Sequence, residues 1–489
     1  MPTKPNLIDR AIRSISPVWA AKRMAARFSI DKALSYKGAD TSRLRNDWII
    51  GTDSSTPDAW TLSTLRSRSR DLNRNDPVAS GATETMSVNI VGQGLRPQAR
   101  LRADRLGISK KRAKDLTKAA ESIWQEWCPD ADAANRLSFD EIQFIAIRKI
   151  IEDGEISALP IMTNEPWRKI KRCLELVEAR RLTSHDDPNG IKLGRRGEPL
   201  SYTFKSTHPK TFKTTYKTIA ARDDRGRKKV IHAFPTKRPG QIRGIPVFAP
   251  VLTYFKDLAD YMEAEVVAAR VAACLAVFIT KGDSMTAGAL SMGDTTDAAG
   301  NRIQGVEPGM VSYLDVGENI NVVDPKRPGD SFSPFIESIL RMIGMAIGMP
   351  YELLVKDFSK TNYSSARAAL LEGRRHFMSW RHWFAQKFCQ PIYDLVLEEA
   401  FLRGHFDAPN FYDNRVEYTR ALWIGGGWGW VDPVKEVESS NRAIKYNLST
   451  LAEEAAAQGR DWEEVLEQRK REEDLAKQLN LTDEEDNES

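Results

Sequence analysis

The stretch MPYELLVKDFSKTNYSSARAALLEGRR, residues 349–375, separates two helical patterns by a short polar link. Before it, apolar residues recur at helical spacing from Phe335, and the pattern stops at Met349-Pro350 because a proline ring disfavours continuation of a helix. After it, a second long helix is expected from Tyr363 onward. The polar link, residues 356–362, is therefore predicted to be an exposed loop between two helices.

A third long helical pattern lies upstream of this stretch. Pro250 opens it, and its apolar residues step by three and four, which predicts one buried stripe. The stripe consists of Leu252, Phe255, Ala259, Met262, Val266, Ala269 and Ala273. The acids that lie largely off the stripe are Asp257, Asp260, Glu263 and Glu265. At about 1.5 Å per residue, a helix from Pro250 to Ile279 spans roughly 35 Å, which is long for an ordinary domain.

The remaining patterns predict an α+β chain that is predominantly helical. Helices are expected at Thr61–Leu72 and Phe139–Ile151, and strands near Ile156–Met162 and Tyr202–Phe204. Residues 281–334 are rich in glycine and turn residues, which indicates a compact insertion with short β-like runs such as Met310–Leu314.

The C-terminal part carries three helix-start signals. They are Asp432 before Pro433, Thr450 with Glu453 three residues later, and Asp461 with Glu464 three residues later. Gly459 is expected to separate the last two helices, and the final residues are expected to fray.

Charge is distributed unevenly along the chain. The net charge is +5, but residues 452–489 hold fourteen acids against five bases, so an acidic tail of −9 follows a body of +14. Residues 1–60 read as a basic, loosely ordered arm. Two helices have basic faces that are either solvated or directed at a polyanion. Their residues are Lys110, Lys111, Arg112 and Lys114 on one, and Arg367, Arg374, Arg375, Arg381 and Lys387 on the other, which Pro391 is expected to kink.

Compartment signals favour a reducing cytoplasm and no membrane. The four cysteines form no C-x-x-C pair, so neither a zinc clip nor a disulfide framework is indicated. The N-terminus carries charges where a signal peptide needs an apolar stretch. The apolar runs Val266–Ile279 and Met342–Val355 are too short to span a bilayer.

Motifs for catalysis are missing from the sequence. The phosphate-binding P-loop is excluded because no Gly-Lys pair occurs, and there is no H-E-x-x-H or G-x-S-x-G pattern. No metal, cofactor or catalytic residue is therefore expected. The acid pairs Asp186-Asp187, Asp223-Asp224 and Glu398-Glu399 could hold a metal for nuclease chemistry, although solvated loops or helix faces are favoured. The glycine-rich run Gly425–Trp430 is expected to be a tight loop that packs two tryptophans.

Several long strings, in one order from Asp47 to Gln468, resemble the lambda-type family of phage portal proteins. They are RSRSRDLNRNDP (66–77), NIVGQGLRPQ (89–98), DGE (153–155), ELVEARRL (175–182), IRGIPVFAPVL (242–252), EAEVVAARVAA (263–273), EPGMVSYLDVGENI (307–320), the stretch at 349–375, GGWGWVDPVKEVESSNRAI (426–444) and GRDWEEV (459–465). The resemblance implies an elongated portal-type subunit in a ring, usually dodecameric, around a channel for double-stranded DNA.

By analogy with the family, the chain divides into regions. These are the arm (1–60), the wing (61–248), the first stem helix (249–280), the clip (281–334), the second stem helix (335–354), the tunnel loop (355–362), a long tunnel helix (363–404), a return to the wing (405–430) and a helical crown with an acidic tail (431–489).

The resemblance also implies which residues face the channel. The tunnel loop would present Lys356, Asp357, Phe358, Ser359, Lys360, Thr361 and Asn362. Its two lysines would supply sparse positive charge, and Phe358 and Asn362 would set the local bore. Asp257, Asp260 and Glu263 would form the channel face of the stem and reduce sticking to DNA.

The implied partners are other copies of the chain, double-stranded DNA, the terminase large subunit, head–tail adaptor proteins, the major capsid protein and the scaffold. The protein would belong to the head vertex of the virion and would assemble in the host cytoplasm. ATP-driven packaging would come from the terminase, so the chain would not be an enzyme. Two other hypotheses remain open: a different DNA-associated virion or adaptor protein, and a metal-dependent DNA-processing enzyme that uses one of the acid pairs.

Overall fold

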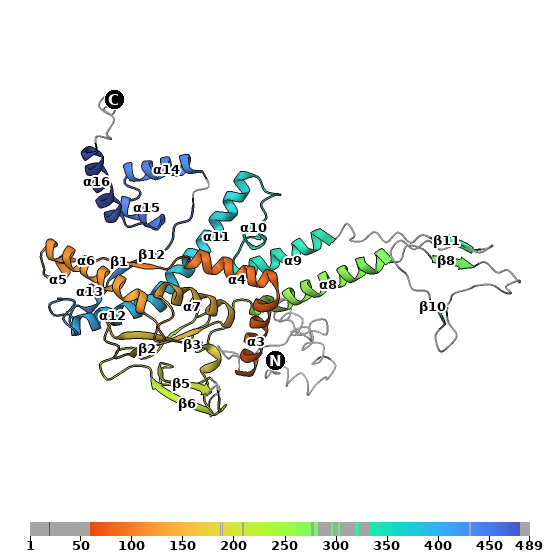
Figure 1. Ribbon diagram of the computed structural model, residues 1–489, viewed down its shortest axis with the longest axis horizontal. Helices are drawn as coiled ribbons and strands as arrows, with labels where there is room; N and C mark the ends of the chain where they lie inside the picture. Colours follow the sequence, from red (N-terminus) through yellow and green to blue (C-terminus); the bar gives the residue numbers. More distant parts are fainter. Residues whose placement is uncertain are drawn as a thin grey trace, which may run out of the picture. The chain divides into compact units, whose positions relative to one another are not determined.

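The computed structural model (Figure 1) describes residues 59–185, 187, 189–207, 210–274, 332–429 and 432–479, together with Trp19 and the segments 278–281, 295–296, 302–303 and 318–321. The chain divides into two compact units, Met1–Ser55 and Thr56–Ser489. Only Trp19 is described in the first unit, so nearly all of the expected basic arm lies outside the described residues. All helices and strands with described bounds belong to the second unit.

Two consecutive helices open this unit, α3 (Ala59–Asn75) and α4 (Pro77–Ile90). Asp76 separates them, and its side chain accepts a hydrogen bond of 2.7 Å from the backbone N–H of Ala79. Pro77 stands in the first turn of α4, where its missing N–H costs no helical hydrogen bond. The helix predicted at Thr61–Leu72 is confirmed and is longer at both ends.

The aromatic centre of the core lies between α6 (Lys110–Trp127), α7 (Phe139–Asp153) and α12 (Gln390–Leu402). The ring of Trp124 on α6 lies 4.8 Å from that of Phe139 and 5.3 Å from that of Tyr393, in edge-to-face contacts. The single turns α5 (Ala103–Leu106) and η3 (Cys128–Asp130) flank α6. Residues more than 250 positions apart in the chain thus share one core.

A two-stranded sheet joins the same distant regions. Strand β1 (Arg96–Ala99) pairs antiparallel with β12 (Ala421–Ile424), with Arg96 opposite Ile424 and Ala99 opposite Ala421. The short helix α13 (Arg415–Tyr418) leads into β12. The C-terminal third of the chain is therefore hydrogen-bonded to the beginning of the second unit.

Two three-stranded antiparallel sheets confirm the α+β expectation. In the first, β2 (Ile156–Met162) pairs with both β3 (Arg172–Glu178) and β7 (Ile231–Ala233), and the 3-10 turn η4 (Ala179–Arg181) follows β3. In the second, β5 (Pro199–Thr207) lies between β4 (Ile191–Leu193) and β6 (Thr214–Ala220). This second sheet has a small core of its own, which includes Tyr202 and Phe204.

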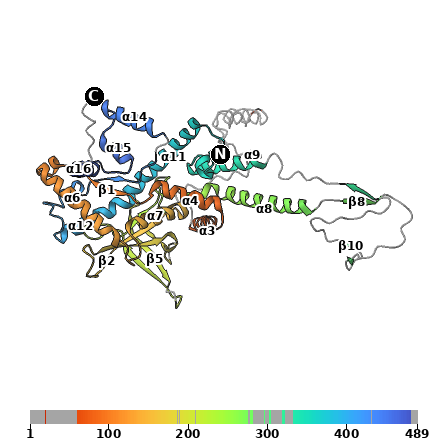
Figure 2. The same ribbon diagram turned by 45° about the horizontal axis from the view of Figure 1, so that its top comes forward.

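Helices α8 (Leu252–Cys274) and α9 (Phe332–Ile347) lie side by side (Figures 1 and 2), and the 3-10 turn η5 (Ala249–Val251) precedes α8. The ring of Tyr261 on α8 lies 5.7 Å from that of Phe332 and 5.1 Å from that of Phe335. These aromatic contacts hold the two helices together beyond the base of α8, where Phe255 is completely buried.

The predicted buried stripe of α8 is wrong beyond Phe255. The buried and half-buried residues step by three, as Leu252, Phe255, Leu258 and Tyr261, and then include Glu265. Met262 and Val266, placed on the predicted stripe, are 41% and 47% exposed. The buried face drifts around the helix because α8 packs first against the core and then against α9. A second apolar stripe is left uncovered in the single chain.

The predicted ends of these helices also need correction. The helix expected from Pro250 to Ile279 ends at Cys274, and strand β8 (Phe278–Lys281) pairs antiparallel with β11 (Glu318–Asn321). Phe278, Ile279 and Thr280 are aromatic or β-branched, which favours a strand. Within the insertion, β9 (Thr295–Thr296) pairs with β10 (Arg302–Ile303). The other residues between 282 and 331, including the β-like run at Met310–Leu314, lie outside the described residues.

The chain turns sharply after α9. Gly348 has a φ of +72°, and a short helix, α10 (Tyr351–Val355), follows Pro350, so the helical segment expected over 335–354 is two helices. The long helix α11 (Tyr363–Phe384) then continues through a π-helical turn (Ala385–Cys389) into α12. The kink expected at Pro391 takes this form, since the proline has no N–H to donate within the helix.

The three C-terminal helices begin at the predicted caps. They are α14 (Pro433–Lys445), α15 (Leu451–Ala457) and α16 (Trp462–Gln478). Asp432 accepts from the N–H of Lys435, Thr450 and Glu453 form a capping box, and Asp461 accepts from the N–H groups of Glu463 and Glu464. Gly459, with a φ of +74°, separates α15 from α16 as expected.

Acids of α16 pair with the basic face of α6. Lys114 lies 3.1 Å from Glu463, and Lys118 lies 2.8 Å from Glu467. Each pair is roughly half exposed and contributes little alone, but the two lie one helical turn apart and fix one orientation of α16. This part of the basic face is thus occupied by the chain's own acidic C-terminal helix.

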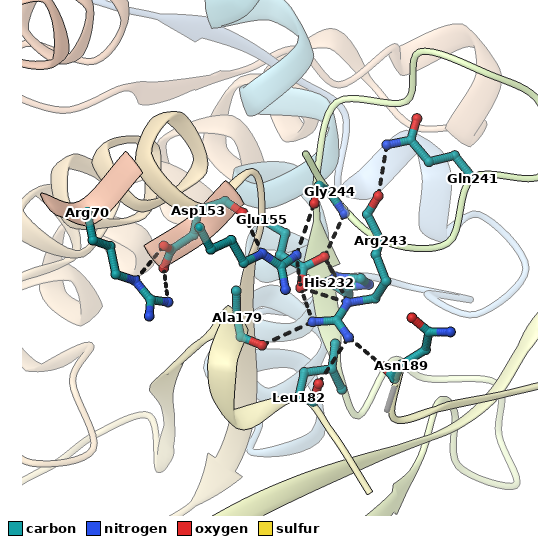
Figure 3. A network of polar contacts seen from close by, with 11 residues as sticks. Arg70, Asp153, Glu155, Ala179, Leu182, Asn189, His232, Gln241, Arg243 and Gly244 are labelled. Carbon is teal, nitrogen blue, oxygen red and sulfur yellow. Dashed lines mark hydrogen bonds and ion pairs between the residues drawn. The ribbon is translucent and has the colours of Figure 1, made fainter. Parts of the chain in front are cut away.

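A buried carboxylate, Glu155, is the centre of the polar network in Figure 3. Arg243 donates to it from Nε at 2.8 Å, Arg66 Nη2 lies 2.9 Å away, and the Nε2 of His232 lies 3.1 Å away. The backbone N–H of Gly244 donates a further bond of 2.7 Å. Burial raises the pKa of Glu155, but the surrounding cations outweigh this effect and hold it well below its usual value.

The same arginines bind backbone carbonyls from several segments (Figure 3). Arg243 donates to Leu182, Asn189 and Ala179, at 2.7 to 3.0 Å. Arg66 donates to the carbonyls of Asp153 and Gly244, and Arg70 holds the side chain of Asp153 with two bonds of 2.7 and 2.9 Å. Four of the strings quoted above, at 66–77, 153–155, 175–182 and 242–252, therefore meet in one network.

Two glycines of this network are required by close backbone approach. Gly154 has a φ of +88°, and a Cβ there would lie 2.4 Å from the backbone of Ile245. A Cβ at Gly244 would lie 2.0 Å from the carbonyl oxygen of Gly154. The two segments can touch only because neither residue has a side chain.

Replacement of Glu155 tests how much this network contributes to the free energy of unfolding. We expect Glu155→Gln to lower the free energy of unfolding by about 3–5 kcal/mol, because two arginines would stay buried without their counter-charge. Urea denaturation at fixed protein concentration measures the change. Glu175→Gln is the matched control, since its partner Arg181 is 3.5 Å away and both side chains are over a third exposed, and a change below about 1 kcal/mol is expected. Equal losses in the two variants would contradict the central role of Glu155.

A pH dependence is expected where α16 meets α6. Burial raises the pKa of Glu121 to about 7, the N–H of Ala99 opposes this, and Asp461, Glu464 and Glu463 raise it further. A carboxyl whose folded-state pKa lies above its unfolded value stabilises the fold while protonated, and that contribution is lost as the pH rises through this window. Hydrogen-exchange protection of α16 should therefore fall between about pH 5 and about pH 8.

The control for this pH effect is a second glutamate of α6. Glu121→Gln should make the protection of α16 independent of pH. Glu126→Gln, which removes an exposed pair with Lys169 at 2.5 Å, should leave the pH dependence intact. Persistence of the full pH effect in Glu121→Gln would assign it to another group.

Candidate nucleic-acid interface

The loop predicted at residues 356–362 connects α10 to α11. It begins at Lys356, whose φ of 56° ends α10 in the left-handed region, and it ends at Asn362. Every side chain in it is exposed except that of Thr361, which is half-buried. The polar link at 356–362 is thus an exposed loop, and Val355, which the predicted tunnel loop includes, is the last residue of α10. The direction in which the loop faces in an assembly stays a prediction.

Three loop residues have local structural roles. Asp357 accepts a hydrogen bond of 2.9 Å from the N–H of Ser359. The hydroxyl of Thr361 donates to the carbonyl of Phe358 at 2.9 Å. The side chain of Asn362 accepts from the N–H of Ser365 at 2.9 Å, so it caps α11. Asn362 was expected to set the local width of the channel. The oxygen of its side-chain amide is engaged in capping α11.

The two lysines of the loop differ in their surroundings. Lys360 forms an ion pair with Glu337 on α9, which raises the pKa of Lys360 and lowers that of Glu337. Glu337 also lies 3.2 Å from Arg341. Lys356 is exposed and has no ion pair among the described residues. Of the two predicted positive charges, that of Lys360 is paired and that of Lys356 has no partner among the described residues.

The stem acids Asp257, Asp260 and Glu263 are all exposed on α8, as predicted. Asp260 pairs with Lys256 one turn earlier at 2.5 Å. Among the described residues no hydrogen bond or ion pair joins these acids to the loop, which contacts α9 instead. The structure therefore does not bring the two predicted groups together within one chain.

Two arginines of the basic face of α11, Arg374 and Arg381, make internal contacts, whereas Arg375 and Lys387 are exposed. Arg381 donates to the carbonyls of Ile90 and Asn89 at 2.9 and 3.0 Å and lies 4.6 Å from the ring of Trp428. Burial lowers the pKa of Arg381 to about 10. Arg374 donates to the carbonyl of Gly429 at 2.8 Å. These two arginines hold the glycine-rich loop, which packs Trp428 as expected, while Trp430 lies outside the described residues.

Three acids of the predicted pairs, Asp223, Glu398 and Glu399, pair with arginines. Glu398 lies 3.1 Å from Arg415, and Glu399 lies 2.6 Å from Arg403. Asp223 lies 2.6 Å from Arg227. Local spacing could have suggested two of these pairings, since Arg403 follows Glu399 and Arg227 follows Asp223 by four residues. Asp186 lies outside the described residues.

The described residues contain neither a cluster of metal ligands nor a helix that could cross a membrane. No group of three or more His, Cys, Asp or Glu side chains in the described part of the chain could hold a metal ion. Among the described helices, none has the length and apolar character that crossing a bilayer requires.

Three phage proteins that are similar to this chain over most of its length are named as portal proteins or as a probable portal protein. The portal protein of Escherichia phage N15 is 25% identical over 438 residues and covers 83% of each chain. Portal protein B of Escherichia phage lambda is 25% identical over 438 residues, which are 83% of this chain and 82% of that protein. The probable portal protein of Halomonas phage phiHAP-1 is 24% identical over 455 residues, 89% of this chain and 85% of that protein.

A solved structure of the neck of an empty gene transfer agent particle, computed with C6 symmetry, is 13% identical, with a TM-score of 0.43, and the match covers 86% of this chain and 99% of that chain. The family model for the lambda family of phage portal proteins matches residues 41–381. Because this match extends over well more than half of the sequence, the chain belongs to the lambda family of phage portal proteins.

Proposed function

We propose that copies of this portal protein assemble into a closed ring, a dodecamer, at one vertex of the phage head, and that double-stranded DNA enters and leaves the head through its channel. Membership of the lambda portal family supports the role. The observation that carries the assembly is the uncovered apolar stripe on α8, which a single chain leaves in water.

The apolar surface continues across both long helices. On α8 it includes Met262, Val266 and Val267, which are 41 to 50% exposed. On α9, Phe335 is 49% exposed and Met345 is 79% exposed. The exposed apolar side chains of α8 in one copy would pack against those of α9 in a neighbouring copy. Head-to-tail contacts of this kind, between two different surfaces, close into a ring when the rotation between copies divides a full turn.

The regions of the subunit are assigned by analogy with the family. We assign α8 and α9 to the stem, the insertion between them to the clip, residues 61–248 and 405–430 to the wing, and α14–α16 to the crown. The tunnel loop is residues 355–362, and the tunnel helix is residues 363–404. The acids Asp257, Asp260 and Glu263 would line the channel. Their repeated negative charge would keep the phosphate backbone of DNA from binding tightly during transport.

The tunnel loop supplies the opposite charge sparingly. Lys356 is exposed, whereas the charge of Lys360 is compensated by Glu337. One lysine per subunit without an ion-pair partner among the described residues, repeated by ring symmetry, would centre DNA without holding it. Phe358, which is 39% exposed, would narrow the passage at the same level.

The partners belong to this proposal as well. The terminase large subunit would supply ATP-driven packaging at the clip, head–tail adaptors would bind after packaging, and the major capsid protein and scaffold would surround the wing during assembly in the host cytoplasm. The chain itself would act by shape and symmetry without catalysis. The alternative of a different DNA-associated virion or adaptor protein differs in lacking a central channel. The alternative of a metal-dependent nuclease is disfavoured by the arginines that occupy Glu398, Glu399 and Asp223.

Electron microscopy of the purified protein tests the ring directly. The wild type should form closed rings with a central channel, and Val266→Asp should yield smaller species, because a charge would be buried between neighbours. Val416→Asp is the control, since Val416 is apolar and 79% exposed on α13, and its rings should persist. Circular dichroism should show that both variants are folded. Particles of wild type without a channel would overturn the proposal.

DNA affinity of the assembled ring tests the stem acids. The double variant Asp260→Asn, Glu263→Gln should bind a short DNA duplex at least about tenfold more tightly at low salt, since each copy loses two negative charges. Fluorescence anisotropy at two salt concentrations measures this. Glu438→Gln, which removes an acid of α14 that is 57% exposed, should leave the affinity unchanged. An equal gain in both variants would mean that net charge, and not the channel face, determines binding.

A further inference from the structure

A cavity of about 440 Å³ lies beside the Glu155 network, between α3 and the turns around η4 and Arg243. Its wall carries four arginines: Arg66, Arg70, Arg180 and Arg243. Ser63 and Ser67, on the same side of α3, add hydroxyl groups. None of the described residues that line the cavity is acidic. The wall is therefore strongly cationic and rich in hydrogen-bond donors.

Two carboxylates form the direct ion pairs of three of these arginines. Glu155 is shared by Arg66 and Arg243, and Asp153 pairs with Arg70. The charges of Glu178 and Glu152 also act on Arg70, so the buried pair Arg66 and Arg243, which shares one carboxylate, is the least compensated. Burial lowers the pKa of Arg66 to about 10, Glu155 opposes this, and the charges of Arg243 and Arg70 add to the lowering. An anion in the cavity would relieve this repulsion.

Two further side chains are placed to complete such a site. Arg180 is 71% exposed, and its pair with Glu178 at 3.1 Å is at the surface, where ion pairs are weak. The buried Oδ1 of Asn189 has no hydrogen-bond partner among the described residues. The two ends of an asparagine amide are assigned from their surroundings, and in the reversed orientation the NH₂ group would donate at this position.

We propose that this cavity binds a phosphate group, either as free phosphate or as part of a DNA backbone. Guanidinium groups bind phosphate oxygens through paired N–H donors, and several converging arginines with hydroxyl groups match an anion with three or four acceptor oxygens. The site is distinct from the channel loop and from the stem acids, and it does not depend on the number of subunits in the ring.

Titration of the full-length protein with inorganic phosphate tests the site. Isothermal calorimetry at neutral pH, with chloride at matched ionic strength as the reference, should show saturable binding. Arg180→Gln combined with Ser67→Ala should weaken it about tenfold or more, because two donors at the cavity are lost while the Glu155 network is kept. Arg68→Gln is the matched control, since Arg68 is exposed on the same helix and does not line the cavity, and its affinity should equal that of the wild type.

A short DNA duplex distinguishes the two sources of phosphate. If the duplex binds more weakly to the Arg180→Gln, Ser67→Ala variant than to Arg68→Gln, and inorganic phosphate competes with it, the site takes a backbone phosphate. If only inorganic phosphate binding depends on these residues, the site takes the free ion. Phosphate and chloride with indistinguishable effects, or equal losses in Arg68→Gln and the cavity variant, would overturn the proposal.

Discussion

The ion pairs of Glu155 with Arg66 and Arg243 are the constraint on which the arrangement of the second unit depends. A buried carboxylate must be compensated where it lies, so the segments that carry its partners cannot move apart. Those segments are α3, the end of α7 with β2, the turn after β3, strand β7, and the chain that leads into α8. Because Arg243 and Gly244 come a few residues before Phe248 and Val251, which are buried, the network also fixes the base of α8 against the core.

Local structure was largely predictable because its causes are local. The caps at Asp432, Thr450 and Asp461 act over three residues, and each begins a helix where expected. Pro350 and the loop at 356–362 were located for the same reason. The buried stripe of α8 was predicted wrongly after Phe255 because one helix carries apolar residues for two interfaces. Sequence periodicity adds the two together, and only the positions of α9 and the core separate them.

The candidate interface was predictable in position but not in the roles of its residues. The polar link at 356–362 is an exposed loop, whereas Val355, which the resemblance adds to it, belongs to α10. The resemblance could not reveal that Asn362 caps α11 or that Lys360 is paired with Glu337, since the second contact joins residues 23 positions apart. The Glu155 network has no local signal at all, because Arg243 lies 88 positions from Glu155 and Arg66 lies 87 positions from Asp153, whose carbonyl it binds. Four of the strings that carry the resemblance, at 66–77, 153–155, 175–182 and 242–252, supply the residues of this long-range contact.

The pairing of Lys360 with Glu337 has a mechanical consequence. The ion pair links the loop at 356–362 to α9, and the stacked rings of Tyr261 and Phe332 link α9 to α8. A displacement of the loop would therefore act on both helices. The buried base of α8 would stay fixed during such a displacement. Salt would weaken the ion pair of the exposed lysine and leave the aromatic contacts intact, so the coupling of the loop to α9 would depend on ionic strength, whereas that of α9 to α8 would not.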